Sequence, residues 1–138
     1  MSDHTVLAVS EQLSPSKALH ITLWMVQVLA AAVLCIAGGT KLAGADMHIA
    51  IFEQIGLGQW FRYVTGGLEV LGAILLLVPT TAAMGAVLLA PTMVGAIATH
   101  LFVIGGSPVP ATVLLLMTLA VAWYRRPVSG SGDTSRRA

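Results

Sequence analysis

The stretch LHITLWMVQVLAAAVLCIAGGTKL, residues 19–42, decides the fold class of this chain, because it is apolar almost throughout and contains no acidic residue. A helix needs about 20 apolar residues to cross the hydrocarbon core of a bilayer. The run is also longer than the apolar core of a cleavable signal peptide, which has about 7–15 residues. The stretch therefore predicts a retained membrane-spanning helix.

Further apolar runs follow at residues 61–78, 82–104 and 109–124. Turn signals separate them, with Pro79-Thr80-Thr81 after the first of these and Gly105-Gly106-Ser107-Pro108 after the second. Short connections favour antiparallel packing of consecutive helices. We therefore expect an all-α integral membrane protein, an antiparallel four-helix bundle spanning residues 19–126.

The longest connection between these runs, residues 43–59, predicts a short amphipathic helix. Asp46 can cap its start and Gly56 can end it. Its apolar residues at three-residue spacing are Ile49, Phe52 and Ile55. Such a helix would lie in the membrane interface or fold back over the mouth of the bundle.

The composition agrees with a single membrane domain: 57% of residues are hydrophobic, 9% are charged, and the mean hydropathy is +0.87. The formal net charge of +1 gives no basic footprint for nucleic acid. The single cysteine, Cys35, excludes an internal disulfide and a multi-cysteine metal site. Residues 1–18 and the Ser/Gly-rich residues 127–138 are expected to be a mobile segment and a disordered tail.

Basic residues at the two ends of the bundle sequence predict its orientation. Lys17 precedes the first run, and Arg125-Arg126 follow the last one. Positive charge is retained on the cytoplasmic side, so both termini are expected there, as an even number of spans permits. Trp60 and Trp123-Tyr124 then fit the two opposite membrane interfaces.

Three ionisable residues interrupt the apolar runs: Lys41, Glu69 and His100. A charge at membrane depth costs at least about 2.5–3.5 kcal/mol unless it is paired or hydrated. A rise of about 1.5 Å per residue along alternating helices places all three in the outer half of the bundle. We therefore predict one polar cluster, open to the non-cytoplasmic side or the outer leaflet. Thr65, Met93 and Phe102 are the predicted lining of its pocket.

This cluster has a structural and a functional interpretation. Lys41 and Glu69 could form an ion pair that locks two helices together, with His100 adding a hydrogen bond, and breaking such a buried pair costs about 3–5 kcal/mol. Glu69 and His100 could instead act as general acid and base, with Lys41 holding a polar group of the substrate. His100 and Glu69 alone are a weak metal signal, so no metal site is predicted.

Small residues and a proline suggest how the cluster is housed. Gly66, Gly67 and Gly72 allow neighbouring helices to approach Glu69 closely. Pro91 removes one backbone hydrogen bond and leaves the carbonyl of Val87 without its helical donor. A kink at that position can open a cavity.

Several motifs together resemble the DoxX-like family of small four-helix membrane proteins. They are Ala37-Gly38-Gly39-Thr40-Lys41-Leu42, Phe52-Glu53-Gln54-Ile55-Gly56-Leu57, Gly66–Ala73 with Leu75–Pro79, Gly95-Ala96 with His100-Leu101, and Trp123–Arg126. The family takes its name from a subunit of a thiosulfate:quinone oxidoreductase, and many members have no assigned activity. The resemblance implies a multi-pass protein of a bacterial-type cell membrane and, by analogy alone, a quinone as cofactor or ligand.

Three functions stay open at this point. The first is a lipophilic-ligand site in a quinone-linked oxidoreductase component. The second is a cofactor-free acid/base isomerase or hydrolase acting on a small apolar substrate. The third is a non-enzymatic scaffold or accessory subunit. The expected partners are the lipid bilayer, a lipophilic small molecule and other membrane or redox subunits. Selective transport is disfavoured, because four short spans are too few for a pore unless the chain oligomerises.

Overall fold

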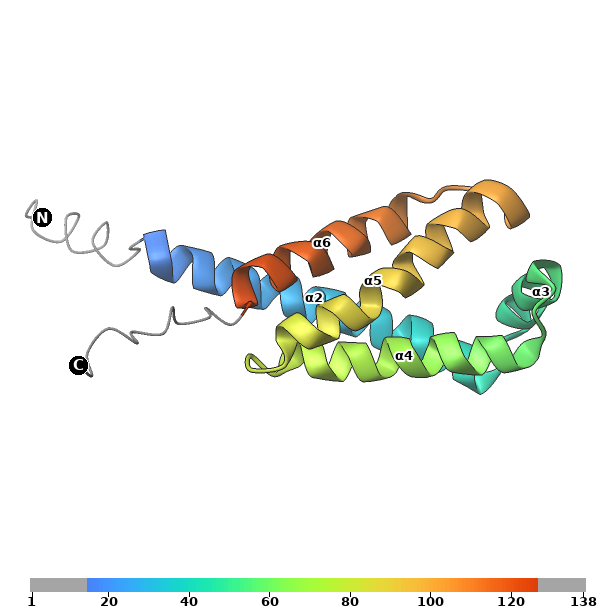
Figure 1. Ribbon diagram of the computed structural model, residues 1–138, viewed down its shortest axis with the longest axis horizontal. Coiled ribbons are helices and arrows are strands. Elements are labelled where there is room, and N and C mark those ends of the chain that lie inside the picture. The colour runs from blue at the N-terminus through green and yellow to red at the C-terminus, as the bar shows by residue number, and fades with distance from the viewer. Residues whose placement is uncertain (1–14, 127–138) are drawn as a thin grey trace, which may run out of the picture.

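The computed structural model describes residues 15–126, and its regular elements there are all helices. They are α2 (Pro15–Ala43), α3 (Asp46–Ile55), α4 (Gln59–Leu77), α5 (Ala82–Thr99), the π-helix η1 (His100–Ile104) and α6 (Val109–Arg125) (Figure 1). The predicted tail at 127–138 lies outside the described residues, and so does most of the predicted segment 1–18. Residues 15–18 already belong to α2.

Three helical stretches are long and apolar enough to cross a membrane: Lys17–Ala43, Gln59–Leu77 and Ala82–Ile104. Helix α6 is apolar but shorter, with 17 residues. The outward surface of the bundle carries large apolar side chains on every long helix, as lipid contact requires. The expected all-α membrane bundle is therefore confirmed.

Helices that follow one another in the chain pack side by side. Helix α2 packs on α4, α4 on α5 and α5 on α6, while α6 returns to make a smaller contact with α2. Both ends of the described chain lie at one end of the bundle, and α3 lies at the other (Figure 1). The core between the long helices consists of Ala30, Ala31, Leu34, Ala73, Leu76, Ala82, Ala86, Leu89, Met93 and Val121.

Glycines set the closest helix crossings. A Cβ added at Gly38 of α2 would lie 2.7 Å from the carbonyl oxygen of Gly66 on α4. A Cβ at Gly72 would lie 2.5 Å from Leu89 Cγ on α5. These distances are too short for real carbon contacts, so the glycines permit the approach that small residues typically provide in membranes. Gly67 has open space around it, so of the predicted contact glycines only Gly66 and Gly72 serve this purpose.

Helix α3 forms where the amphipathic pattern predicts, but its start differs from the expectation. Ala45 occupies the N-cap position without a side-chain hydrogen bond, and Asp46 is the first helical residue. The capping role predicted for Asp46 is therefore wrong, although a carboxylate in the first turn still suits the helix dipole. Gly56 ends the helix with φ +79°, a conformation that glycine adopts without steric cost.

Candidate functional site

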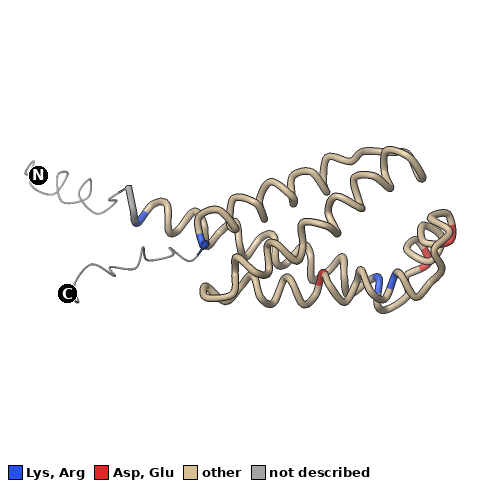
Figure 2. The backbone as a smooth tube through the Cα atoms, in the orientation of Figure 1, with Lys and Arg blue, Asp and Glu red and all other residues tan. Residues whose placement is uncertain are grey.

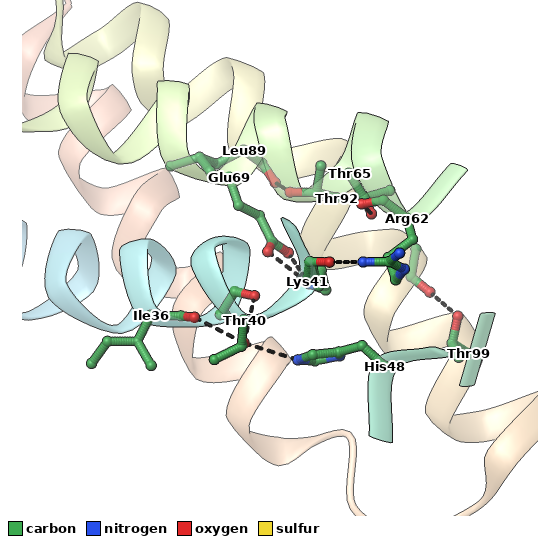
Figure 3. A network of polar contacts seen from close by, with 12 residues as sticks. Ile36, Thr40, Lys41, His48, Arg62, Thr65, Glu69, Leu89, Thr92 and Thr99 are labelled. Atoms are coloured by element: carbon green, nitrogen blue, oxygen red, sulfur yellow. Dashed lines mark hydrogen bonds and ion pairs between the residues drawn. The ribbon is translucent and has the colours of Figure 1, made fainter. Parts of the chain in front are cut away.

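The centre of the site is an ion pair between α2 and α4. The Nζ of Lys41 lies 2.5 Å from Oε1 and 2.6 Å from Oε2 of Glu69, so one ammonium binds both carboxylate oxygens (Figure 3). The Glu69 side chain is 2% exposed and that of Lys41 14% exposed. The pair follows directly after the crossing of Gly38 and Gly66, which brings the two backbones close enough for a short contact.

Arg62 is a second buried cation beside this pair, and sequence reasoning gave it no role. It is 3% exposed and donates through Nη1 to the backbone carbonyl of Lys41 (Figure 3). Its Nε donates to Gln59 Oε1 at 2.8 Å, and Gln59 Nε2 donates to the Ile49 carbonyl of α3 at 3.0 Å. The guanidinium therefore lies at the C-terminus of α2, where the helix dipole favours positive charge. Arg62 thereby joins α4 to the end of α2, and Gln59 extends the link to α3.

His48 of α3 also belongs to the site, although its sequence context gave no sign of this role. Its Nε2 lies 3.0 Å from Thr40 Oγ1 of α2 (Figure 3). Burial lowers the pKa of His48 below its ordinary value of 6.5, and the positive charges of Lys41 and Arg62 lower it further. The imidazole is therefore mainly neutral at neutral pH and adds no third cation to the site.

A cavity of about 320 Å³ opens beside the ion pair. It lies among α3, α4, α5 and η1, with Lys41 contributed by α2. Its lining is Lys41, His48, Ile51, Phe52, Ile55, Phe61, Val64, Thr65, Leu68, Glu69, Pro91, Thr92, Gly95, Ala96, Thr99, His100 and Ile104. A mostly apolar wall with a few convergent polar groups is the usual composition of a small-molecule pocket.

The predicted polar residues meet only in part. Lys41, Glu69 and His100 all line this one cavity, but the ion pair joins only the first two. His100 is the first residue of η1, and its Nδ1 lies 3.3 Å from the Gly105 carbonyl oxygen. Within the described structure no hydrogen bond joins its ring to Glu69, so the hydrogen bond expected in the structural interpretation is not formed there. The general acid and base roles of Glu69 and His100 stay a prediction.

The predicted lining residues divide in the same way. Thr65 lines the cavity, and its hydroxyl donates to the Arg62 carbonyl at 3.1 Å. Met93 is instead buried in the core of the bundle. Successive residues of a helix differ in direction by about 100°, so the preceding residue Thr92 lines the cavity while Met93 points away from it. Phe102 is 83% exposed on the outside of η1. The assignment of Met93 and Phe102 to the pocket wall is therefore corrected.

A second polar contact, at the other end of the bundle, escaped the sequence analysis. Gln27 of α2 is fully buried, and its Nε2 donates to the Leu76 carbonyl of α4 at 2.7 Å. Its Oε1 accepts from Arg125 Nε of α6 at 3.0 Å. A lone amide inside the long apolar run of residues 19–42 is the signal that could have revealed it.

The chemistry available at the cavity follows from the ion pair. An ammonium has three N–H donors, and Lys41 directs two of them to Glu69, which leaves one for a bound molecule. The Glu69 oxygens retain lone pairs that can accept a further proton donor. Within residues 15–126 no three His, Cys, Asp or Glu side chains lie close enough together to hold a metal ion. The site therefore suits a neutral polar group that both accepts and donates hydrogen bonds.

The fold and the site together define a helical membrane protein with a buried ion pair beside a ligand-sized cavity. The sequence profile of the DoxX-like family matches residues 25–124, which is most of the chain. The protein belongs to the DoxX-like family, and the resemblance inferred from its motifs is confirmed. No curated protein and no solved structure matches it.

Proposed function

We propose that this protein binds a lipophilic molecule with a neutral polar head group, and that the ligand is of the quinone type. The observation that carries the proposal is the apolar cavity of about 320 Å³ with the Lys41–Glu69 pair in its wall. A quinone carbonyl would accept the remaining N–H of Lys41, and the hydroxyl of the reduced form would donate to Glu69. The protein would then serve as a component of a quinone-linked oxidoreductase.

The proposed setting is a bacterial-type cell membrane crossed four times, with both termini on the cytoplasmic side. Helix α6 would be the fourth span, because its 17 residues extend over about 25 Å and Trp123 and Tyr124 near its end are exposed as interfacial aromatics. Lys17 near the start of α2 and Arg125 at the end of α6 lie at the end of the bundle opposite α3, which the positive-inside rule would make the cytoplasmic end. Figure 2 shows basic residues at the end of the described chain opposite α3, acidic residues on α3, and further charges of both signs between these ends.

Binding of tetramethyl-benzoquinone to the protein in lipid nanodiscs tests this function. The double variant Lys41→Met/Glu69→Leu removes both charges without leaving either unpaired, and we expect it to bind the quinone at least about tenfold more weakly than wild type. Phe102→Leu, on the outside of the same end of the bundle, is the matched control and should bind like wild type. Absence of saturable binding to folded wild-type protein, or equal binding to the double variant, would overturn the proposal.

One observation favours a second candidate, a non-enzymatic scaffold. Lys41 occupies both oxygens of Glu69, and the pair lies directly beside the tight crossing of Gly38 and Gly66, as expected of a packing device. In this case the double variant should keep wild-type stability and wild-type cellular function. Loss of cellular function in a double variant that remains folded would exclude the scaffold role.

A further inference from the structure

A second hollow lies on the lipid-facing side of the bundle, between α4 and α5. Its lining is entirely apolar and consists of Leu68, Leu75, Ala83, Met84, Val87, Leu88 and Pro91. Two of these residues, Leu68 and Pro91, also line the cavity beside the ion pair. The hollow, called the tail groove below, therefore adjoins the cavity, with Leu68 and Pro91 at the border between the two.

The tail groove runs along the helices away from the ion pair. Leu68 and Leu75 lie seven positions apart on α4, and Met84 and Pro91 lie seven positions apart on α5, so each wall extends over about 10 Å. The two helices diverge from their connecting turn toward the end that carries α3 (Figure 1). The groove therefore extends from the border of the cavity toward the turn after α4.

Helix α3 covers the other side of the cavity. It packs against both α4 and η1, and Ile51, Phe52 and Ile55 on it line the cavity. Gln59 holds it in place through the Ile49 carbonyl. With α3 seated across the cavity in this way, the groove between α4 and α5 is the approach that is lined by apolar side chains alone.

We propose that the tail groove holds the hydrocarbon chain of the molecule whose head group occupies the cavity, and that this molecule enters sideways from the bilayer between α4 and α5. The ligand class is then an amphiphile with a compact neutral head and one linear or isoprenoid tail. The inference rests on the proposed function, because the cavity must bind the head group. It adds a second subsite, with a direction of entry that needs no movement of α3.

Photo-crosslinking in nanodiscs locates the tail. The probe is a trimethyl-benzoquinone with a decyl chain that carries a diazirine at its end. We expect crosslinks on Met84, Val87 or Leu88 that disappear when excess decyl-trimethyl-benzoquinone without the diazirine competes. Ordinary lipid-exposed residues would also be labelled, but without competition, so saturable labelling distinguishes a subsite from chance contact with the bilayer.

A matched pair of valines on α5 controls for the bulk of a substitution. Val87 is 66% exposed and lines the tail groove, while Val94, seven positions later on the same helix, is 55% exposed and lines neither hollow. Val87→Trp should abolish the competed crosslinks and weaken binding of the decyl quinone about tenfold, with unchanged binding of tetramethyl-benzoquinone. Val94→Trp should change neither measurement.

The outcomes separate the two proposals. If tetramethyl-benzoquinone binds but the crosslinks are not competed, or Val87→Trp behaves like Val94→Trp, the tail groove is wrong while the head-group site stands. If wild-type protein binds neither quinone saturably, the proposed function fails and the tail groove fails with it.

Discussion

Two polar clusters join the long helices of this bundle, one toward each end, and only one of them borders a cavity. The cavity cluster consists of Lys41, His48, Arg62 and Glu69, and the terminal cluster consists of Gln27 and Arg125. Each connects separate helices through hydrogen bonds across the core. Neither residue of the terminal cluster lines the cavity or the tail groove.

The two clusters differ in whether open space lies beside their polar groups, which is the feature that distinguishes a binding site from a packing contact. In both clusters hydrogen bonds offset much of the desolvation cost of the polar groups, although Arg125 Nη2 of the terminal cluster is buried without a hydrogen-bond partner. The hydrogen bonds of the terminal cluster join α2, α4 and α6 and border no cavity. The cavity cluster keeps donor and acceptor capacity next to about 320 Å³ of open space, which packing alone does not require.

Removing one partner of the ion pair should have the largest effect. We expect Lys41→Met to lower the free energy of unfolding by about 3–5 kcal/mol, because it leaves the Glu69 carboxylate buried and unpaired. Lys41→Met/Glu69→Leu should recover most of this loss. Denaturant unfolding in detergent measures both. A Lys41→Met protein as stable as wild type would mean that the pair is hydrated and carries no packing role.

The same kind of change in the terminal cluster should cost less. Gln27→Leu leaves the Leu76 carbonyl and the Arg125 side chain without their partner, so we expect a loss of about 1–3 kcal/mol. Val28 follows Gln27 in the chain and has an exposed side chain. The free energy of unfolding of Val28→Leu should therefore stay within about 0.5 kcal/mol of wild type. If Gln27→Leu also abolished binding of tetramethyl-benzoquinone, the two clusters would be coupled and the distinction between them lost.

Adjacent glycines on α2 sharpen the account of how the cavity cluster is assembled. Gly38→Ala should destabilise the protein by about 1–3 kcal/mol, because its Cβ would overlap the Gly66 carbonyl oxygen. Gly39→Ala meets nothing within 4 Å and should instead stabilise α2 by up to about 1 kcal/mol through helix propensity. Thermal unfolding of the two variants side by side checks this. Equal changes in stability would contradict the close contact of α2 and α4 at Gly38 and Gly66.

The smallest expected effect is a pH dependence specific to the cavity cluster. The pKa of His48 is lowered in the folded state, so the unfolded chain takes up a proton more readily once the pH falls below 6.5. The contribution of neutral His48 to stability is therefore present above pH 6.5 and lost as the pH falls through the folded-state pKa. His48→Gln should remove this part of the pH dependence of unfolding. An unchanged pH profile in His48→Gln would contradict the partial burial of His48 beside Lys41 and Arg62.

Much of the fold could be predicted from the sequence, because the apolar runs have membrane length and the breaks between them contain Pro and Gly. That Lys41 and Glu69 lie level with one another along the bundle also followed from simple helix geometry, and their contact required only that α2 and α4 pack at Gly66. These features depend on local sequence and on the bilayer, which imposes the same constraint on every span.

The remaining errors arise where tertiary contacts decide. His48 and Arg62 lie in or next to a connection, and their burial depends on where α3 docks. Gln27 differs from its apolar neighbours only by its amide. Phe102 lies in a π-helix, whose wider turn changes the direction of side chains relative to the α-helical periodicity of α5, so its outward position could not be extrapolated.

The most direct test of the central claim compares the two clusters in one binding experiment. Tetramethyl-benzoquinone is titrated into nanodiscs that hold wild-type protein, Lys41→Met/Glu69→Leu or Gln27→Leu. A ligand site at the cavity cluster predicts at least about tenfold weaker binding to the double variant and wild-type affinity for Gln27→Leu, although Gln27→Leu is the less stable protein. Equal affinity of the double variant and wild type, or an equal loss in both variants, would contradict it.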